Sequence, residues 1–212
     1  MEKNLYLVRH GETLFNSRNL IQGVVNAPLV LEGVAQALHT RKNYFENKQI
    51  PYDHVYCSPE GRCIQTTQLL TEKPYVEKVD LHEMCFGKLE GCPAYLCPKP
   101  SEFATYYKTI GGESTAEVQK RMNKVLFEIM NDPENQNVLA VAHGCANQAF
   151  CDYWKPYWKI PGDNIAVLNN CSVLHFTFDP GTQVFTLVEA FNEDFHTEDL
   201  EAARATGQAL IV

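Results

Sequence analysis

Residues Leu5–Gly11 read LYLVRHG, and this stretch decides the fold that the chain can adopt. Its run of four apolar residues is typical of a short strand buried on both faces. The glycine allows a turn directly after the strand, so Arg9 and His10 are expected at the strand's carboxyl end. The stretch therefore predicts a buried strand that ends in an arginine and a histidine.

The same arrangement recurs further along the chain. An apolar run at 138–142 ends at His143 and Gly144, and a helix is expected to follow it to about 153. Other strands are expected at 54–57 and 79–81, with a hairpin at 173–178 and 184–190. Further helices are expected from Pro28 to about Lys48, from an N-cap at Ser58 to about Leu70, and from a capping box at Ser114 to Asp132.

Alternating strands and helices indicate an α/β fold, in which a mostly parallel sheet is covered by helices on both faces. Ligands of such sheets bind beyond the carboxyl ends of the strands. His10 and His143 both fall at such ends, and Glu83 follows the brief strand expected at 79–81. The pattern therefore predicts that these side chains share one site.

Length and composition narrow the classes of function. The chain has 212 residues, so we expect a single domain over 1–212, with an irregular excursion at about 84–112. A net charge of −8 disfavours nucleic acid and anionic lipid as partners. The N-terminal apolar run is too short for a signal peptide, and no stretch approaches the roughly 20 apolar residues of a membrane span. These features predict a cytoplasmic protein that does not bind membranes.

The chain contains eight cysteines but no Cys-x-x-Cys pair. The usual spacing of a structural zinc site is therefore missing. Disulfide scaffolds are much shorter and denser in cysteine than this chain. We expect free thiols, most of them buried and acting as small apolar residues.

Each candidate reactive residue has a functional and a structural interpretation. A neutral imidazole at His10 is a nucleophile, and the fork of Arg9 suits phosphoryl oxygens. Arg62, near a helix N-terminus, and His143, at a strand end, lie where anions bind. Glu83 is the acid that could protonate a leaving oxygen. Taken singly, each could instead be a capping or solvated residue.

The combination resembles the phosphoglycerate mutase-like branch of the histidine phosphatase superfamily. The resemblance covers most of residues 4–195. It is carried by these residues, in this order: Arg9-His10-Gly11-Glu12-Thr13, Asn16, Gln22-Gly23, Pro28-Leu29, Gly33, Gln36-Ala37, Ser58-Pro59, Arg62, Gln65-Thr66, Glu83, Phe86-Gly87, Glu90-Gly91, Gly112-Glu113-Ser114 and His143-Gly144. It implies a three-layer α/β/α sandwich with a mostly parallel central sheet.

The resemblance also implies roles for individual residues. His10 would carry the phosphoryl group, Arg9, Arg62 and His143 would form the phosphate pocket, and Glu83 would donate the proton. The further substrate-binding residues that it implies are Asn16, Gln22, Gly23 and Gly144. Members of the family need no metal, and we expect no cofactor.

The expected activity is that of a histidine acid-type phosphatase, which hydrolyses a small phosphomonoester. A phosphoglycerate mutase is the main alternative, but the stretch Met84–Gly112 lacks the arginine pair that the mutases carry there. A cysteine-based phosphatase needs Cys-x5-Arg, and the loop from Cys57 to Arg62 is one residue short. A non-catalytic phosphate-binding module of the same fold is the remaining possibility. The expected partner is a small phosphorylated metabolite, and a homodimer is possible.

Several aromatic residues of the chain could wall a pocket for a ring-bearing substrate or could equally belong to the core. The sequence leaves this open. They are Phe86, Tyr95, Phe103, Tyr106, Tyr107, Trp154 and Trp158.

Overall fold

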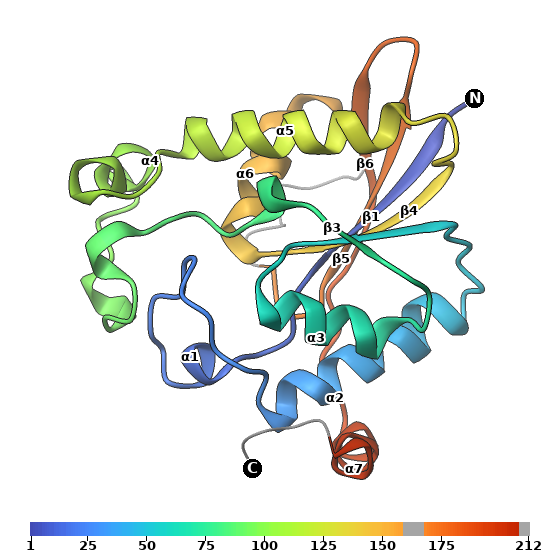
Figure 1. Cartoon of the computed structure of the whole chain (residues 1–212), viewed down its shortest axis with the longest axis horizontal. Coiled ribbons are helices and arrows are strands. Elements are labelled where there is room, and N and C mark those ends of the chain that lie inside the picture. Colours follow the sequence, from blue (N-terminus) through green and yellow to red (C-terminus); the bar gives the residue numbers. More distant parts are fainter. Residues whose placement is uncertain (159–167, 208–212) are drawn as a thin grey trace.

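The computed structural model describes residues 1–158 and 168–207, and within them six strands form one sheet (Figure 1). The strands are β1 (Lys3–Arg9), β2 (His54–Cys57), β3 (Val76–Glu77), β4 (Asn137–Ala142), β5 (Val173–Asp179) and β6 (Val184–Phe191). Their order across the sheet is β3-β2-β4-β1-β5-β6. The first four of these strands pair in parallel, and β5 pairs antiparallel with both β1 and β6. The expected hairpin and the mostly parallel sheet are confirmed.

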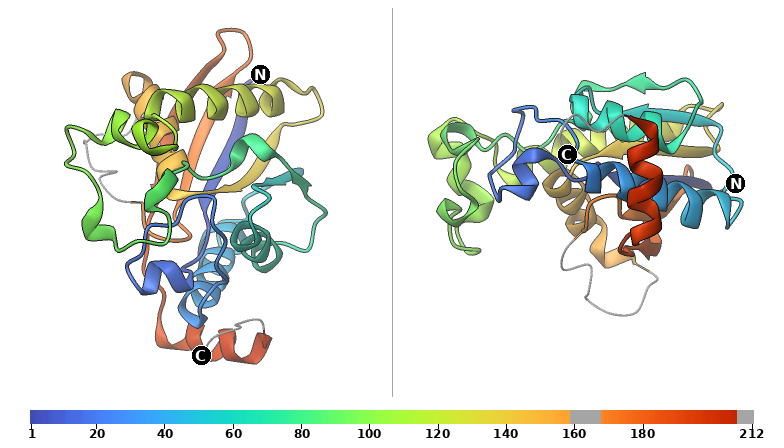
Figure 2. Two further views of the ribbon diagram at one scale, coloured as in Figure 1. Left: turned by 60° about the vertical axis from the view of Figure 1, so that its left-hand side comes forward. Right: turned by 90° about the horizontal axis from the view of Figure 1, so that it is seen from below.

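Helices cover both faces of the sheet (Figure 1). One face carries α2 (Leu31–Thr40), the π-helical segment Arg41–Glu46 that continues it, and α3 (Gly61–Leu70). The other face carries α5 (Thr115–Asn131) and α6 (Gly144–Trp154). The helix α7 (Thr197–Thr206) lies across α2, as Figure 2 shows. The three-layer α/β/α sandwich is therefore present.

The alternation of side chains along β1 explains why a short apolar run suffices to hold these layers together. Successive residues of a strand point to opposite faces. Leu5 and Leu7 belong to the core under α5 and α6, whereas Tyr6 and Val8 belong to the core under α2 and α3. All four side chains are buried. A strand at the centre of a three-layer fold must be apolar on both faces, and β1 is.

Two expected elements differ in the structure. Residues Val79–Leu81 form a 3₁₀ turn and not a strand, because Val79 is solvent-exposed and β3 has already ended at Glu77. The helix expected from Ser58 begins at Gly61, so Glu60 is its N-cap residue and Ser58 is not. The hydroxyl of Ser58 instead faces His143. The C-terminal helix α7 had no counterpart among the expected elements.

Residues 84–112 form an irregular excursion at the carboxyl ends of the parallel strands (Figure 1). Its short helical pieces are Gly87–Leu89, Ala94–Leu96, α4 (Phe103–Tyr106) and Tyr107–Ile110. Gly87, at φ +58°, lies so close to the end of the 3₁₀ turn Tyr107–Ile110 that a Cβ would stand 2.4 Å from the carbonyl oxygen of Ile110. A close backbone approach that only glycine permits therefore closes this excursion. The short α1 (Leu14–Ser17) lies beside it on the same edge of the sheet.

All eight cysteines are free, as expected. Four are buried, namely Cys57, Cys63, Cys151 and Cys171. Among the helices of the described residues, none combines the length and the apolar character that crossing a bilayer requires.

Candidate active site

The parallel pairing of β1 with β4 brings the two predicted histidines together. Arg9 is opposite Ala142 in the register, so the next residues along the two strands are His10 and His143. The N–H of His10 donates to the carbonyl oxygen of Ala142 at 3.0 Å. The two imidazole rings meet edge to face, with 5.2 Å between their centroids.

His10 is held as a neutral imidazole with one defined tautomer. Its ring is 3% exposed, and Nδ1 lies 2.7 Å from the carbonyl oxygen of Gly11. Because a carbonyl oxygen only accepts, Nδ1 carries the proton and the lone pair is on Nε2. Burial first, and then the positive charge of Arg62, lowers the pKa of His10 well below 6.5. The residue therefore keeps a nucleophilic lone pair even in mildly acidic solution.

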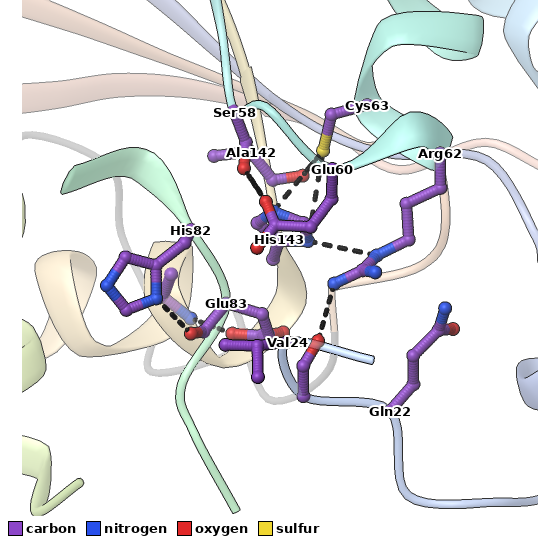
Figure 3. A network of polar contacts seen from close by, with 12 residues as sticks. Gln22, Val24, Ser58, Glu60, Arg62, Cys63, His82, Glu83, Ala142 and His143 are labelled. Atoms are coloured by element: carbon purple, nitrogen blue, oxygen red, sulfur yellow. Dashed lines mark hydrogen bonds and ion pairs between the residues drawn. The ribbon is translucent and has the colours of Figure 1, made fainter. Parts of the chain in front are cut away.

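Arg62 and His143 form one buried polar network with the start of α3 (Figure 3). The Nε of Arg62 donates to Nδ1 of His143 at 3.2 Å. Nε2 of His143 lies 2.7 Å from the hydroxyl of Ser58 and 3.1 Å from a carboxylate oxygen of Glu60. Burial, followed by the charge of Arg62, lowers the pKa of His143 well below 6.5. Its Nδ1 therefore accepts while its Nε2–H donates.

The loop before α2 anchors the guanidinium of Arg62. Its terminal nitrogens donate to the carbonyl oxygens of Gly23, at 2.7 Å, and Val25, at 3.0 Å. The Arg62 side chain is fully buried. These bonds fix the plane of the guanidinium and leave further N–H groups for another acceptor.

Arg9 presents a donor without a partner. One terminal nitrogen donates to the carbonyl oxygen of Leu168. Its Nε is buried and has no hydrogen-bond partner within the described residues. Burial lowers the pKa of Arg9, and the nearby carboxylate of Glu83 opposes this shift. A buried guanidinium N–H without an acceptor indicates a place for an anionic ligand.

Glu83 is held by the N-terminus of α6. One carboxylate oxygen accepts from the N–H groups of Met84 and Ala146, both at 2.8 Å, and the other accepts from Cys145 at 3.1 Å. The side chain is 4% exposed. Burial raises the pKa of Glu83, although the three N–H groups oppose the shift. A carboxyl group with a raised pKa is suited to give and take a proton.

A cavity of about 330 Å³ opens at these strand ends. Six of the predicted residues line it: Arg9, His10, Asn16, Gln22, Glu83 and Gly144. The Asn16 side-chain oxygen accepts from the N–H of Thr13 at 3.1 Å, which leaves its amide NH₂ for a ligand. Arg62 and His143 do not line the cavity: the ring of His143 contacts that of His10, and Arg62 donates to His143. Gly23 does not line the cavity, and its place in the site is through the carbonyl that anchors Arg62.

Sequence reasoning missed two groups at the site. Glu60 and Ser58 contact the ring of His143, yet neither was assigned a functional place. The available signal was an acid two residues before the predicted pocket arginine, in Ser58–Arg62. His82, Cys63 and Cys145 adjoin site residues in the sequence, and in the structure they contact Glu83 and His143.

The two roles that the sequence left open overlap, because Phe86 and Tyr107 belong to the core and also line the cavity. Phe86, Phe103 and Tyr107 line the cavity. Tyr95 is 80% exposed, and Trp154 is buried in the core under α5 and α6. In the part of the chain that the structure describes, no three His, Cys, Asp or Glu side chains cluster in a way that could hold a metal ion.

Comparison with known proteins identifies relatives of the chain in sequence and in fold. A probable phosphoglycerate mutase GpmB from Yersinia pestis (strain Pestoides F) is 32% identical over 153 residues, which are 67% of this chain and 70% of that protein. The fold is shared by a phosphoglycerate mutase from Bacillus anthracis str. Sterne, with a TM-score of 0.76 and 20% identity over 96% of this chain and 97% of that one. It is also shared by a phosphoserine phosphatase from Entamoeba histolytica solved with 3-phosphoglyceric acid, with a TM-score of 0.71 and 22% identity over 93% and 98% of the two chains.

Some of these proteins are named as mutases and others as phosphatases. The model of the histidine phosphatase superfamily (branch 1) matches residues 5–190, a range that contains His10, Arg62, Glu83 and His143. The chain therefore belongs to the histidine phosphatase superfamily.

Proposed function

We propose that this chain is a phosphohydrolase that removes the phosphate from a small phosphomonoester through a phosphohistidine on His10. The observation that carries the proposal is the state of this side chain. Its Nδ1–H donates to Gly11, its pKa is depressed, and Arg9 and His143 flank it. A bare Nε2 beside buried positive charge is the arrangement that nucleophilic attack on a phosphate dianion requires.

The first half of the reaction forms a bond between His10 and phosphorus. The lone pair of Nε2 attacks the phosphorus, the bond from phosphorus to the ester oxygen breaks, and the carboxyl of Glu83 gives that oxygen a proton. In the second half, the Glu83 carboxylate takes a proton from water, whose oxygen attacks the phosphorus. The bond from Nε2 to phosphorus then breaks and releases inorganic phosphate. The raised pKa of Glu83 suits both transfers.

The buried cations stabilise the charge that moves through these steps. Arg9 offers its unpartnered Nε, and Arg62 retains free N–H groups although its plane is fixed. His143 stays neutral and orients the guanidinium of Arg62, because its Nδ1 accepts from Arg62 while its Nε2–H faces Glu60 at 3.1 Å. The two arginines supply the positive charge at phosphorus, and Asn16 and the N–H of Gly144 add further donors.

The excursion favours hydrolysis over the mutase reaction. A phosphoglycerate mutase must hold the substrate carboxylate while the phosphoryl group returns to it. Lys88 and Lys99 are exposed and do not line the cavity, and Lys108 is paired with Glu117 at 2.6 Å. A carboxylate in the cavity would therefore meet no cation of the excursion. The names of the relatives make the mutase reaction the competing proposal.

The cysteine-based alternative is disfavoured by the environment of Cys57. This side chain is fully buried on β2, and burial raises the pKa of its thiol to about 12. The nucleophile of cysteine phosphatases is a thiolate, which this environment opposes. Cys57 also lies outside the cavity.

Turnover of para-nitrophenyl phosphate in the presence of a chelator tests the proposal. We expect His10→Asn to lower kcat by at least about 10⁴-fold, as for other covalent nucleophiles, and Cys57→Ser to keep activity. Rapid quenching should trap phosphate on wild-type protein in an acid-labile form and none on His10→Asn. Loss of turnover in the cysteine variant alone would overturn the assignment. Rapid conversion of 3-phosphoglycerate to 2-phosphoglycerate with the bisphosphate present would instead establish the mutase.

A further inference from the structure

The cavity beyond the phosphate-binding residues has an apolar wall. Phe86, Phe103 and Tyr107 line it together with Ile21 and Leu168. The three aromatic rings pack edge to face. The centroids of Phe86 and Tyr107 are 4.8 Å apart, and those of Phe103 and Tyr107 are 5.2 Å apart. We call Phe86, Phe103 and Tyr107 the aromatic wall.

Positive charge is confined to the other end of the cavity. Among its described lining residues, Arg9 is the only arginine or lysine, and Glu83 is the only acid. The nearest arginine of the neighbouring helix, Arg121, is occupied by Glu113 at 2.8 Å and by the carbonyl oxygens of Asp80 and His82. These bonds hold the segment before Glu83 and leave Arg121 outside the cavity.

This distribution selects against a second negative charge on the substrate. A carboxylate placed against the aromatic wall would lose its hydration, find no cation among the described residues, and lie in the same cavity as the Glu83 carboxylate. An aromatic ring would instead exchange water for edge-to-face contacts with three rings that are already ordered. The volume of about 330 Å³ is at the small end for ligand cavities, which limits the substrate to a small molecule.

We propose that the substrate is the phosphomonoester of a small, uncharged, ring-bearing alcohol, whose ring packs against Phe86, Phe103 and Tyr107. This inference rests on the proposed function, because it places the ester oxygen at His10 and Glu83. Phe103 is the specificity-determining residue that is best suited to a test. It is only partly buried, so its replacement disturbs the core less than replacement of Phe86 or Tyr107.

Binding of non-hydrolysable phosphonates tests the inference without turnover. Calorimetric titration with benzylphosphonate, 4-carboxybenzylphosphonate and methylphosphonate compares a ring, the same ring with a carboxylate, and no ring. We expect benzylphosphonate to bind about tenfold more tightly than either of the others, or more. Burial of only a small part of the apolar area of the ring accounts for a tenfold difference in affinity. Equal or tighter binding of the carboxylated ring, or no difference between benzylphosphonate and methylphosphonate, would overturn the inference.

Substitutions in the aromatic wall test whether these residues set the preference for a ring. Phe103→Ala should weaken benzylphosphonate by about tenfold, whereas Tyr95→Ala should leave its affinity unchanged. Tyr95 is the matched control because it belongs to the same excursion but is exposed and does not line the cavity. Phe103→Arg should reverse the order, so that the carboxylated ring binds more tightly than the plain ring. An unchanged order in Phe103→Arg would contradict the position given to the ring.

The outcomes separate this inference from the proposed function. If His10-dependent hydrolysis is found but benzylphosphonate shows no preference, the choice of a ring-bearing substrate fails alone. If benzylphosphonate is preferred but no phosphate is released from benzyl phosphate, hydrolysis fails and the binding assignment remains.

Discussion

The two ends of the cavity are built in different ways. At the phosphate end, strand register sets the positions: Arg9 is opposite Ala142, and the two histidines follow on neighbouring strands. At the far end, the aromatic wall comes from an excursion of short helical turns, closed by the backbone contact of Gly87 with Ile110. The first construction fixes reacting atoms through the main chain. The second only has to present a surface of the right shape and polarity.

The difference implies that the two ends can be perturbed separately. A change at the phosphate end should slow the reaction of every phosphomonoester, because all of them present the same group to His10. A change in the excursion should alter the ratio between ring-bearing and ring-free substrates. That ratio is therefore the measurement that assigns a residue to one end or the other.

After the nucleophile itself, the largest effect is expected from Glu83→Gln. The amide cannot protonate a leaving oxygen, so benzyl phosphate turnover should fall by about 10²–10⁴-fold, the usual contribution of general acid catalysis. The rate of enzyme phosphorylation by para-nitrophenyl phosphate should fall much less, because its leaving group needs no proton. Steady-state and single-turnover rates for the two esters make the comparison. Glu102→Gln, on the exposed side of the excursion, is the control. Equal losses for both esters in single turnovers would contradict a proton-donor role.

A pair of glycine variants should separate the two ends most clearly. A Cβ on Gly33 would lie 2.1 Å from the carbonyl oxygen of Glu12, and Gly33 also contacts the backbone of Gly11. Gly33→Ala must therefore move the loop that follows His10. A displacement of about 1 Å there should cost about 10²-fold in kcat/KM for all esters. Crowding of the backbone should also lower the stability by about 1–3 kcal/mol.

Gly87→Ala is the matching change in the excursion, where φ is +58° and a Cβ would press on Ile110. We expect the preference for benzyl phosphate over methyl phosphate to fall by about tenfold, since the aromatic wall is displaced. Ratios of kcat/KM for the two esters in both glycine variants are the measurement. A changed ratio in Gly33→Ala, or an unchanged one in Gly87→Ala, would show that the two ends are not independent.

Glu60→Gln should have an intermediate effect that belongs to the phosphate end. Its carboxylate is hydrogen-bonded within the network of Ser58 and His143, and it holds the His143 tautomer whose Nδ1 accepts from Arg62. Loss of one charge-assisted hydrogen bond should lower kcat/KM by about tenfold for every ester and leave the ring preference unchanged. Glu72→Gln, at an exposed position just after α3, is the control. A change in the preference for ring-bearing substrates would contradict the assignment of Glu60 to the phosphate end.

The sequence predicted the phosphate end of the site because that end follows from short apolar strands. The runs at 5–8 and 138–142 had to be buried on both faces, and the residues after them had to meet at one edge of the sheet. That reasoning placed His10 and His143 at the same edge, whereas their direct contact depends on the pairing of β1 with β4, which the sequence did not predict. The catalytic roles of these residues remain predictions until turnover is measured.

The remaining parts of the site and of the fold depend on long-range contacts that no local sequence pattern predicts. Whether Glu60 reaches His143 depends on α3 beginning at Gly61, and the sequence placed that start at Ser58. The excursion has no period, so its aromatic residues could not be divided between wall and core. Helix α7 buries only Ala203 among its own residues, which left too weak an apolar pattern to predict it.

The smallest effect concerns stability, and it tests whether the phosphate end holds its imidazole neutral at a measurable cost. In the unfolded chain His10 takes up a proton as the pH falls below its ordinary pKa of 6.5, whereas in the folded protein its pKa is lowered. The unfolded state therefore binds more protons than the folded state. The contribution of His10 to the free energy of unfolding is fully present above pH 6.5 and is lost as the pH falls toward the pKa of His10 in the folded protein. His10→Gln removes this loss, so between pH 6.5 and 5.5 the wild type should lose up to about 1 kcal/mol more than the variant. The raised pKa of Glu83 acts with the opposite sign, but it is present in both proteins and largely cancels in the comparison.

Urea unfolding at a series of pH values measures the difference, with the exposed His54→Gln as control. Parallel curves for wild type and His10→Gln would mean that His10 takes up its proton as readily in the folded protein as in the unfolded chain, so the fold would not hold this imidazole neutral in mildly acidic solution.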